Sequence, residues 1–282
     1  MLKLFNKILV PVDFSAKSKK AVEKAIDIAT QYQCSIHLVH VFTLSPFSAI
    51  SMADGHMAVP LNINDNTTDI ELQLQKLCRH ATVIAGNSVK ITCSLIKGTW
   101  DESIIALVNE NKFDLVLIGQ KSRGLRRRKM MLNPDKIAAQ SNVPVITVPV
   151  NRRIVRLYSI VIPITDFLPE RKLMYGVYIA SKYDTTIKLL GIENEKTKDR
   201  VQYFVEKAYE LIKDNSSVRV ETETIMSYNV AEAVNQFAML EAADLVILNP
   251  GLQTKMPGFL ANLMGNIIQK YSAPPVLTIN PV

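Results

Sequence analysis

An internal repeat restricts the fold of this chain more than any other feature of its sequence. Three short apolar motifs occur twice and in the same order: ILVPVDFS at 8–15 and IVIPITDF at 160–167, FDLVLIGQ at 113–120 and ADLVILNP at 243–250, VPVITVPV at 143–150 and PPVLTINPV at 274–282. Self-similarity at a fixed order is the signature of a duplicated structural unit. The sequence therefore predicts two related halves.

The first half carries an insertion. Pro11 and Pro163 lie 152 positions apart, whereas Asp114 and Asp244 lie 130 positions apart, so about 22 extra residues separate the first and fourth strands of the first half. Residues 45–66 contain Pro, Gly and Asn without a sustained hydrophobic period, and they are the predicted insertion. A loop this long is either functional or disordered, so a lid, a dimer contact and a plain surface loop all stay open.

Strand-sized apolar runs alternate with helical patterns in both halves. In the first half, strands are predicted near 8–13, 34–42, 89–96, 114–118 and 145–148, with helical patterns at 21–29, at Ile70, Leu74, Leu77, Ala81 and Ile84, and at 104–108. Asn133 before Pro134 predicts the start of a further helix, with an N-cap and a proline at the first position. The second half predicts strands near 158–164, 186–192, 217–225, 244–248 and 275–280, and helices near 170–183, 198–214, 230–242 and 259–271.

Strands that alternate with helices join through right-handed crossovers into a parallel sheet covered on both faces. The predicted fold is of the α/β class: two tandem, doubly wound domains, each with five parallel strands in flavodoxin-like order. The domains are residues 1–151 and 152–282, because apolar sequence gives way to charge at Asn151–Arg153.

Composition excludes several classes of protein. With 48% hydrophobic and 21% charged residues, the chain is typical of a well-packed globular protein. No apolar run approaches the roughly 20 residues that span a bilayer, and the N-terminus lacks the order of a signal peptide. The three cysteines have no CxxC spacing, as expected of free thiols, and the four histidines form no metal-ligand pattern. We therefore expect a cytoplasmic protein without a membrane partner or a metal.

The net charge of +7 is concentrated in one segment. Residues 121–129 (KSRGLRRRK) carry six positive charges, which leaves only +1 for the rest of the chain. A protein that binds a long polyanion usually spreads its Lys and Arg over a face. The clustering favours a compact anionic ligand or an acidic partner over nucleic acid, and a solvated basic loop is the equal alternative.

Ligands of doubly wound sheets bind beyond the carboxyl ends of the strands, where the strand order reverses. In flavodoxin-like order, the first and fourth strands bracket that crevice. The first strand ends at Pro11-Val12-Asp13 and the fourth at Gly119-Gln120. We expect these distant residues to meet, and Asp13 has the alternative role of capping the next helix.

The repeated motifs ILVPVDFS, DLVLIG and VPVITV resemble those of the universal stress protein family, and the resemblance extends over nearly the whole chain. It implies five parallel strands with four helices per unit, and pairing through the last strand. Nucleotide-binding members of that family hold ATP with an Asp after the first strand, a Val at the end of the second, and a loop of Gly, two residues, Gly, nine residues, Gly, then Ser or Thr.

This chain departs from that loop pattern. The first glycine is Gly119, but Ser122 stands at the second glycine position and Leu132-Asn133 at the final pair. The resemblance implies these candidate nucleotide-binding residues: Pro11, Val12, Asp13, Val41, Gly119, Gln120, Lys121, Ser122, Arg123, Gly124, Leu132 and Asn133. Arg126, Arg127 and Arg128 are candidate anion-binding residues, because guanidinium groups pair well with phosphate.

The second half has diverged further, with Thr165 in place of the Asp and Asp166 one residue late. We expect it to be a scaffold or pairing domain. The last strands, 145–148 and 276–279, are predicted to pair the halves as an internal pseudo-dimer, which covers two sheet edges; a homodimer also stays open.

No catalytic motif such as GxSxG, HExxH or a Walker-type loop is present. The sequence therefore favours a non-enzymatic binding or signalling protein of the stress response, with a degenerate site for ATP or a related nucleotide in the first half and an unidentified protein partner. One alternative is a nucleotide-binding protein with slow hydrolysis. A weaker one is an RNA- or anion-associated protein that uses the basic loop.

Overall fold

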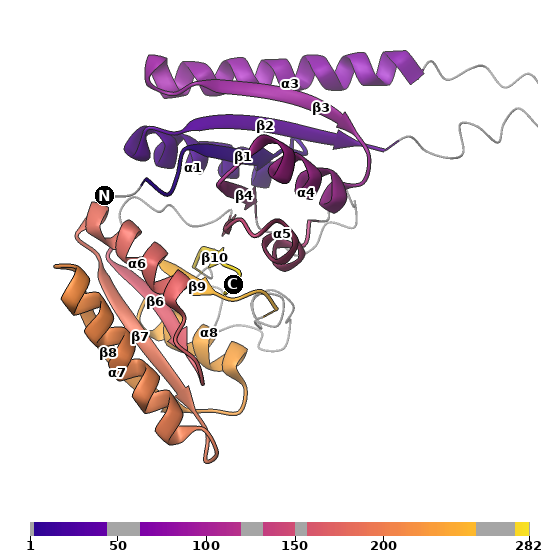
Figure 1. Ribbon diagram of the computed structural model, residues 1–282. Helices are drawn as coiled ribbons and strands as arrows, with labels where there is room; N and C mark the ends of the chain where they lie inside the picture. The colour runs from indigo at the N-terminus through magenta and orange to yellow at the C-terminus, as the bar shows by residue number, and fades with distance from the viewer. Residues whose placement is uncertain (1–2, 44–62, 120–131, 150–156, 252–273, 282) are drawn as a thin grey trace, which may run out of the picture.

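The computed structural model describes residues 3–43, 63–119, 132–149, 157–251 and 274–281 (Figure 1). The elements of the first half are β1 (Lys7–Pro11), α1 (Ala16–Tyr32), β2 (Ser35–Phe42), α3 (Ile63–Ala85), η1 (Gly86–Ser88), β3 (Ile91–Lys97), α4 (Trp100–Asn111), β4 (Leu115–Gly119), α5 (Pro134–Ser141) and β5 (Val145–Val148). Those of the second half are β6 (Ser159–Ile164), α6 (Glu170–Tyr183), β7 (Thr186–Glu193), α7 (Lys198–Asn215), β8 (Arg219–Met226), α8 (Val230–Leu240), β9 (Leu245–Leu248) and β10 (Val276–Thr278).

All described strands form one ten-stranded sheet in the order β3-β2-β1-β4-β5-β10-β9-β6-β7-β8. The strands within a half are parallel, and each half has the order 3-2-1-4-5. The predicted flavodoxin-like order is 2-1-3-4-5 and is therefore wrong in the place of the third strand, which lies at the outer edge beyond the second; the expected neighbourhood of the first and fourth strands is confirmed. The halves join where β10 runs antiparallel to β5, with Leu277 opposite Ile146. The predicted pairing of the last strands is therefore confirmed, and it covers two edges that would otherwise be open.

Asp114 and Asp244, the aspartates of the repeated Asp-Leu-Val motif, each connect the starts of two neighbouring strands by hydrogen bonds: β4 to β1, and β9 to β6. The Asp114 carboxylate accepts hydrogen bonds from the backbone N–H groups of Asn6 and Lys7, at 2.8 and 3.0 Å. Asp244 accepts from Tyr158 and Ser159, at 2.7 and 3.2 Å. The duplicated sequence motif is thus a duplicated clamp at the amino ends of neighbouring strands.

Helices cover both faces of the sheet (Figure 1). On one face, α1, α3, α6 and α7 share a hydrophobic core that is continuous through both halves. On the other face, α4 and α5 cover the first half and α8 covers the second, over separate clusters. Aromatic side chains from both halves contact one another on this shared face. Phe5 stacks on Tyr175 with ring centroids 5.9 Å apart, and Tyr32 stacks on Tyr178 with ring centroids 5.2 Å apart.

One detail of the predicted secondary structure is wrong, because residues 63–66 belong to α3 rather than to the inserted loop. The helical pattern from Ile70 to Ile84 does lie in α3, where Leu74 and Ala81 are buried and Ile84 is 54% exposed. Helix α3 packs on β3, an edge strand of the described sheet, so part of its apolar pattern stays exposed among the described residues.

Three predictions lie outside the described residues: most of the insertion at 45–62, the helix near 259–271 and the boundary at 151–152. In the part of the chain that the structure describes, no helix combines the length and hydropathy of a bilayer span.

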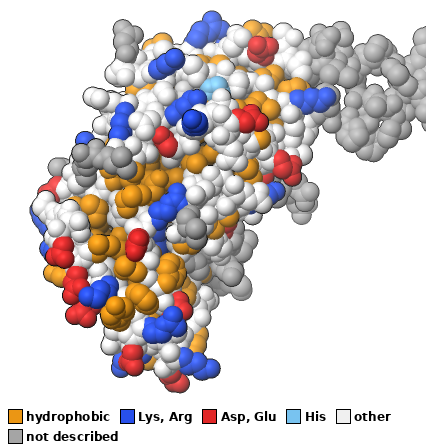
Figure 2. Space-filling view, in the orientation of Figure 1, with side chains coloured by type: hydrophobic (Ala, Val, Ile, Leu, Met, Phe, Trp, Pro, Cys, Tyr) orange, Lys and Arg blue, Asp and Glu red, His pale blue; other side chains and the backbone are white. Residues whose placement is uncertain are grey.

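Figure 2 shows acidic and basic side chains interspersed over the face in view, with apolar side chains gathered over α6 and α7. Met174 and Leu211, at 43% and 39% exposure, belong to this apolar surface.

Candidate functional site

The candidate site lies where the carboxyl ends of β1, β2 and β4 meet. Because β1 pairs with both β2 and β4, Asp13 after β1 and Gly119 at the end of β4 lie at the same edge of the sheet. Helix α1 begins at Ala16, so its N-terminus is at this edge as well. A helix N-terminus presents unpaired N–H groups and a positive dipole end, which favours an anion nearby.

Asp13 organises the start of α1. It is 8% exposed, and its Oδ1 accepts hydrogen bonds from the backbone N and the Oγ of Ser15, at 3.1 and 2.5 Å. Ser15 is the N-cap, and its side chain accepts from the N–H of Ser18. The capping role left open for Asp13 therefore falls to Ser15. Within the described residues, the hydrogen bonds of the Asp13 carboxylate all fall on Oδ1.

Beside Asp13 lies an aromatic group that sequence reasoning missed. Phe14 adopts the left-handed conformation, with φ of 61°, and its ring stacks on His40 at 4.8 Å. The edge of Trp100 meets His40 at 5.3 Å. His40 Nδ1 lies 2.7 Å from the carbonyl oxygen of Val12, which can only accept, so this nitrogen carries the proton. These three residues come from separate segments of the chain, and hydrophobic periodicity does not indicate which side chains stack.

Gly119 is required by packing as much as by any ligand. A Cβ at this position would lie 2.4 Å from the carbonyl oxygen and 2.5 Å from the carbonyl carbon of Lys17, in the first turn of α1. Only glycine permits so close an approach of strand and helix backbones. The close approach sets the position of the N-terminus of α1 at the crevice.

Asn133 begins α5 as the sequence predicts, and Leu132 precedes it. Asn133 is the N-cap, its side chain accepts from the N–H of Lys136 at 3.2 Å, and Pro134 follows at the first helical position. Its own backbone N–H donates to Asp101 in α4 at 3.0 Å, which ties the two helix starts together. Leu132 is half-buried and packs on the core cluster under α4 and α5, which gives the bulky residue a structural role.

Two of the candidate residues do not offer their side chains to a ligand. Val41 is 2% exposed and packs in the core with Ile104 and Val108, so protein covers its side chain, and its place in a nucleotide site stays a prediction. Val12 is fully buried, and its N–H donates to the carbonyl of Val39 at 2.8 Å. Alternation along a strand fixes which side chains are buried, and the position of Val41 places it on a covered face.

The loop that would meet phosphates lies outside the described residues. The loop is residues 120–131, and it contains the candidate residues Gln120, Lys121, Ser122, Arg123, Gly124, Arg126, Arg127 and Arg128. Their roles stay predictions. Across the described residues, no three His, Cys, Asp or Glu side chains come together in a metal-binding group.

The equivalent edge of the second half has a different chemistry. Thr165 is half-buried, and Asp166 is exposed with Oδ2 3.8 Å from Nη2 of Arg200. Lys172 of α6 is 3% exposed, and its Nζ donates to the carbonyl of Pro163 at 2.7 Å. Burial lowers the pKa of Lys172 to about 7. A buried amine thus lies beside the end of β6, and the two halves do not carry the same site.

The sequence and the fold were compared with known proteins. The sequence profile described as "Universal stress protein family" matches residues 4–149. A universal stress protein of Methanocaldococcus jannaschii is 22% identical over 146 residues, which cover 51% of this chain and 82% of that protein. Universal stress protein A of Salmonella typhi is 27% identical over 118 residues, which cover 41% of this chain and 75% of that protein.

Some solved structures match nearly the whole chain, in contrast to the sequence relatives above, which cover about half of it. The crystal structure of a universal stress protein from Archaeoglobus fulgidus has a TM-score of 0.68 at 18% identity, with 98% of both chains covered. A Pseudomonas aeruginosa PAO1 protein described as functionally unknown has a TM-score of 0.57 at 16% identity, with 98% of this chain and 93% of that chain covered. At these identities the likeness concerns the fold, and it extends to the arrangement of both halves.

Proposed function

Because this chain belongs to the universal stress protein family, we propose that it is a non-enzymatic cytoplasmic binding protein of the stress response. Its first half binds ATP or a related nucleotide, and the bound state controls an interaction with a protein partner. The observation that carries this proposal is the meeting of Asp13, Gly119 and the N-terminus of α1 at one edge of the sheet. The second half serves as the pairing scaffold.

In this proposal, the free edge of the Asp13 carboxylate accepts hydrogen bonds from the adenine or the ribose. The main chain around Pro11, Val12 and Val41 shapes the floor of the site. Ser122 and Arg123 face the phosphates, with Lys121 and Arg126–Arg128 supplying countercharge. Leu132 stands where the family motif has a glycine, whose backbone would approach a phosphate closely enough for hydrogen bonds. The loss of one or two such bonds, at about 1.5–3 kcal/mol each, lowers affinity roughly ten- to ten-thousand-fold.

Titration calorimetry with ATP tests which of the two halves binds the nucleotide. The intact chain should bind ATP with submillimolar affinity, Asp13→Ala should lose the binding heat, and Thr165→Ala should retain it. The reason is that the carboxylate position of the first half, Asp13, is occupied by Thr165 in the second half, where Asp166 follows one residue later and lies beside Arg200. Phosphate release measured on the same samples tests the alternative of slow hydrolysis.

Asp13→Ala also removes a partner of the helix cap, so Ser15→Ala is the matched control. That variant loses the side-chain cap and the hydrogen bond from Ser15 Oγ to Asp13, but it keeps the carboxylate and the hydrogen bond from the backbone N–H of residue 15. We expect it to bind ATP within a few-fold of the intact chain. No heat with the intact chain at millimolar ATP, or equal loss in Ser15→Ala and Asp13→Ala, would contradict the assignment.

The second prediction concerns the basic segment. Arg126→Glu, Arg127→Glu and Arg128→Glu in one variant should abolish the salt-sensitive part of ATP binding, since Coulomb pairing with phosphate weakens as salt screens it. The control reverses three exposed lysines of the second half, Lys182, Lys196 and Lys213, for the same change in net charge. If both variants show the same salt dependence of the dissociation constant, the basic segment is a solvated surface.

A further inference from the structure

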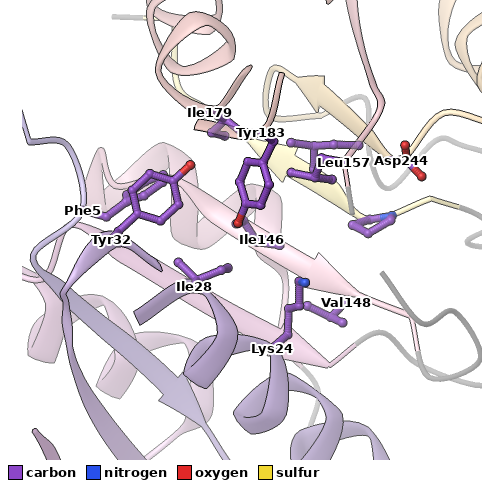
Figure 3. A pocket seen from close by; sticks show the side chains of 12 residues that line it. Phe5, Lys24, Ile28, Tyr32, Ile146, Val148, Leu157, Ile179, Tyr183 and Asp244 are labelled. Carbon is purple, nitrogen blue, oxygen red and sulfur yellow. The ribbon is translucent and has the colours of Figure 1, made fainter. Parts of the chain in front are cut away.

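A groove lies between α1 and α3 on the surface of the first half. Its volume is about 500 Å³, which falls within the roughly 300–1,000 Å³ of pockets that hold small ligands. Figure 3 shows a second hollow, the seam cavity, which Tyr32 of α1 and Tyr183 of α6 line. That cavity has about 50 Å³, against roughly 150 Å³ for an apolar cavity that holds benzene. By size, the groove is the candidate for a ligand and the seam cavity is not.

One side of each helix forms a wall of the groove. Residues three and four positions apart lie on the same side of a helix. The lining residues recur at this spacing from Lys19 to Ile26 in α1 and from Gln73 to Ile84 in α3. At 1.5 Å per residue, these runs extend about 10 Å along α1 and about 16 Å along α3. The groove is therefore long, and its shape suits an extended ligand.

The floor of the groove is apolar. Val22 and Ile26 of α1 and Ala81 of α3 are buried in the core, and Leu77 packs against it. Ile84 is 54% exposed at the surface of α3 and lines the groove as well. Hydrocarbon that lies over these side chains is removed from water, which tightens binding by up to about fourfold for each covered methylene group.

The rim carries positive charge without a matching carboxylate. Lys19 and Lys76 line the groove, both are exposed, and neither has an ion-pair partner among the described residues. Glu23, the acidic residue that lines the groove, pairs with Lys20 at 2.5 Å. His80 adds an N–H donor to the same rim. A lysine stem lies along apolar surface while its ammonium group stays in water, so an anionic head group can pair here without being buried.

From these observations we infer that the groove binds an amphipathic carboxylate, with one aliphatic chain along the floor and its carboxylate beside Lys19 and Lys76. The length and the apolar floor of the groove select the aliphatic chain, and the unmatched charge at the rim selects the sign of the head group. Neither Asp13 nor Gly119 lines the groove. The site is therefore distinct from the candidate nucleotide site and does not depend on the proposed function.

The test uses octanoate as the probe, with octan-1-ol as a neutral probe of the same chain length. The protein is labelled at the isoleucine methyl groups, and each probe is titrated while the methyl NMR signals are followed. Ile26 and Ile84 should shift saturably with octanoate, whereas Ile225 of β8, outside the groove, should not. Hexanoate, with two fewer methylene groups, should bind up to about fifteenfold more weakly.

Lys19→Met and Lys76→Met, combined in one variant, keep the apolar stems and remove both charges. This variant should bind octanoate roughly two- to twentyfold more weakly, since each exposed ion pair contributes up to about fivefold. Its affinity for octan-1-ol should stay unchanged. The control removes two exposed lysines of the second half, Lys182→Met and Lys196→Met, for the same change in net charge. The control should bind both probes as the original protein does.

Ile84→Ser tests the apolar floor, because this side chain is exposed and its removal leaves the buried core in place. Octanoate should bind roughly fivefold more weakly, as read from the signal of Ile26. Val83→Ser changes the neighbouring exposed position, which does not line the groove, and should alter the affinity by less than about twofold.

The inference is overturned if Ile26 and Ile84 show no saturable shift with octanoate, or if Ile225 shifts with them. It is equally overturned if the variant without Lys19 and Lys76 weakens octanoate and octan-1-ol alike, or binds octanoate as tightly as the original protein. If the Ile26 and Ile84 signals shift with protein concentration before any probe is added, a second copy of the protein covers the groove, and the inference fails.

Discussion

Replacing Gly119 by alanine should lower the free energy of unfolding by about 3 kcal/mol, the upper part of the range for an overpacked site. The new Cβ would lie 2.4 Å from the carbonyl oxygen of Lys17, and backbone atoms cannot swing aside as a side-chain end can. Relief requires α1 to move, which disturbs Ser15 and Asp13 at its start. Chemical denaturation followed by the fluorescence of Trp100, the single tryptophan, reports on this half directly.

Gly176→Ala in α6 is the matched control. Its Cβ would also meet an atom too closely, at 2.6 Å, but that atom is Cδ1 at the flexible end of Ile162. Alanine is favoured over glycine inside a helix by about 1 kcal/mol, which offsets the cost of moving the methyl group. We expect stability within about 1 kcal/mol of the original chain by circular dichroism. If both substitutions lower the free energy of unfolding equally, the close approach of Gly119 to the Lys17 backbone does not explain the loss of stability.

The buried Lys172 should make the stability of the protein depend strongly on pH. Its pKa is about 7 in the folded chain and 10.5 as the ordinary value, and burial alone causes the difference. Between these values the unfolded chain binds a proton that the folded chain does not. The free energy of unfolding therefore rises with pH through this window, by roughly 1.4 kcal/mol per unit. Below pH 7 both states are protonated, so the slope disappears and the destabilisation by the buried ammonium group has its full size.

Lys172→Met should remove this slope, because the thioether does not titrate. The stabilising effect of the substitution should be largest near pH 7 and should shrink by roughly 4 kcal/mol by pH 10. Comparing the two chains at each pH cancels the other titrating groups. Lys182→Met, on the exposed side of the same helix, should leave the pH profile unchanged. A constant difference between the Lys172→Met variant and the original chain from pH 7 to pH 10 would refute the account.

Much of the site could be predicted from local patterns. Asn133 and Pro134 start a helix because their side chains and dihedral preferences act on the adjacent backbone. The meeting of Asp13 and Gly119 followed from the expectation that the first and fourth strands bracket the crevice, since parallel strands end at a common edge. Lys172 also left a signal that was missed, because it shares the helical stripe of Gly176, Ile179 and Tyr183 and therefore faces the sheet.

The sequence could not predict which candidate side chains face the site and which are buried in the core. Val41 fits the family motif by its position, yet its side chain belongs to the core under α4. Phe14, His40 and Trp100 come from three separate segments, and their stacking depends on how α4 packs over β2. Sequence spacing constrains neighbours along the chain, whereas these contacts depend on the packing of distant elements.

The sequence by itself determined the duplicated unit and the alternation of strands and helices, because hydrophobic period, turn residues and repeat order are local properties of the chain. The pairing of the last strands was predicted from the repeat together with the family resemblance. Only the tertiary structure decided that Gly119 touches Lys17, that Lys172 loses its water and that Tyr32 lines a cavity between the halves. These features arise where surfaces from different elements meet, and their shape depends on the joint packing of side chains far apart in the sequence.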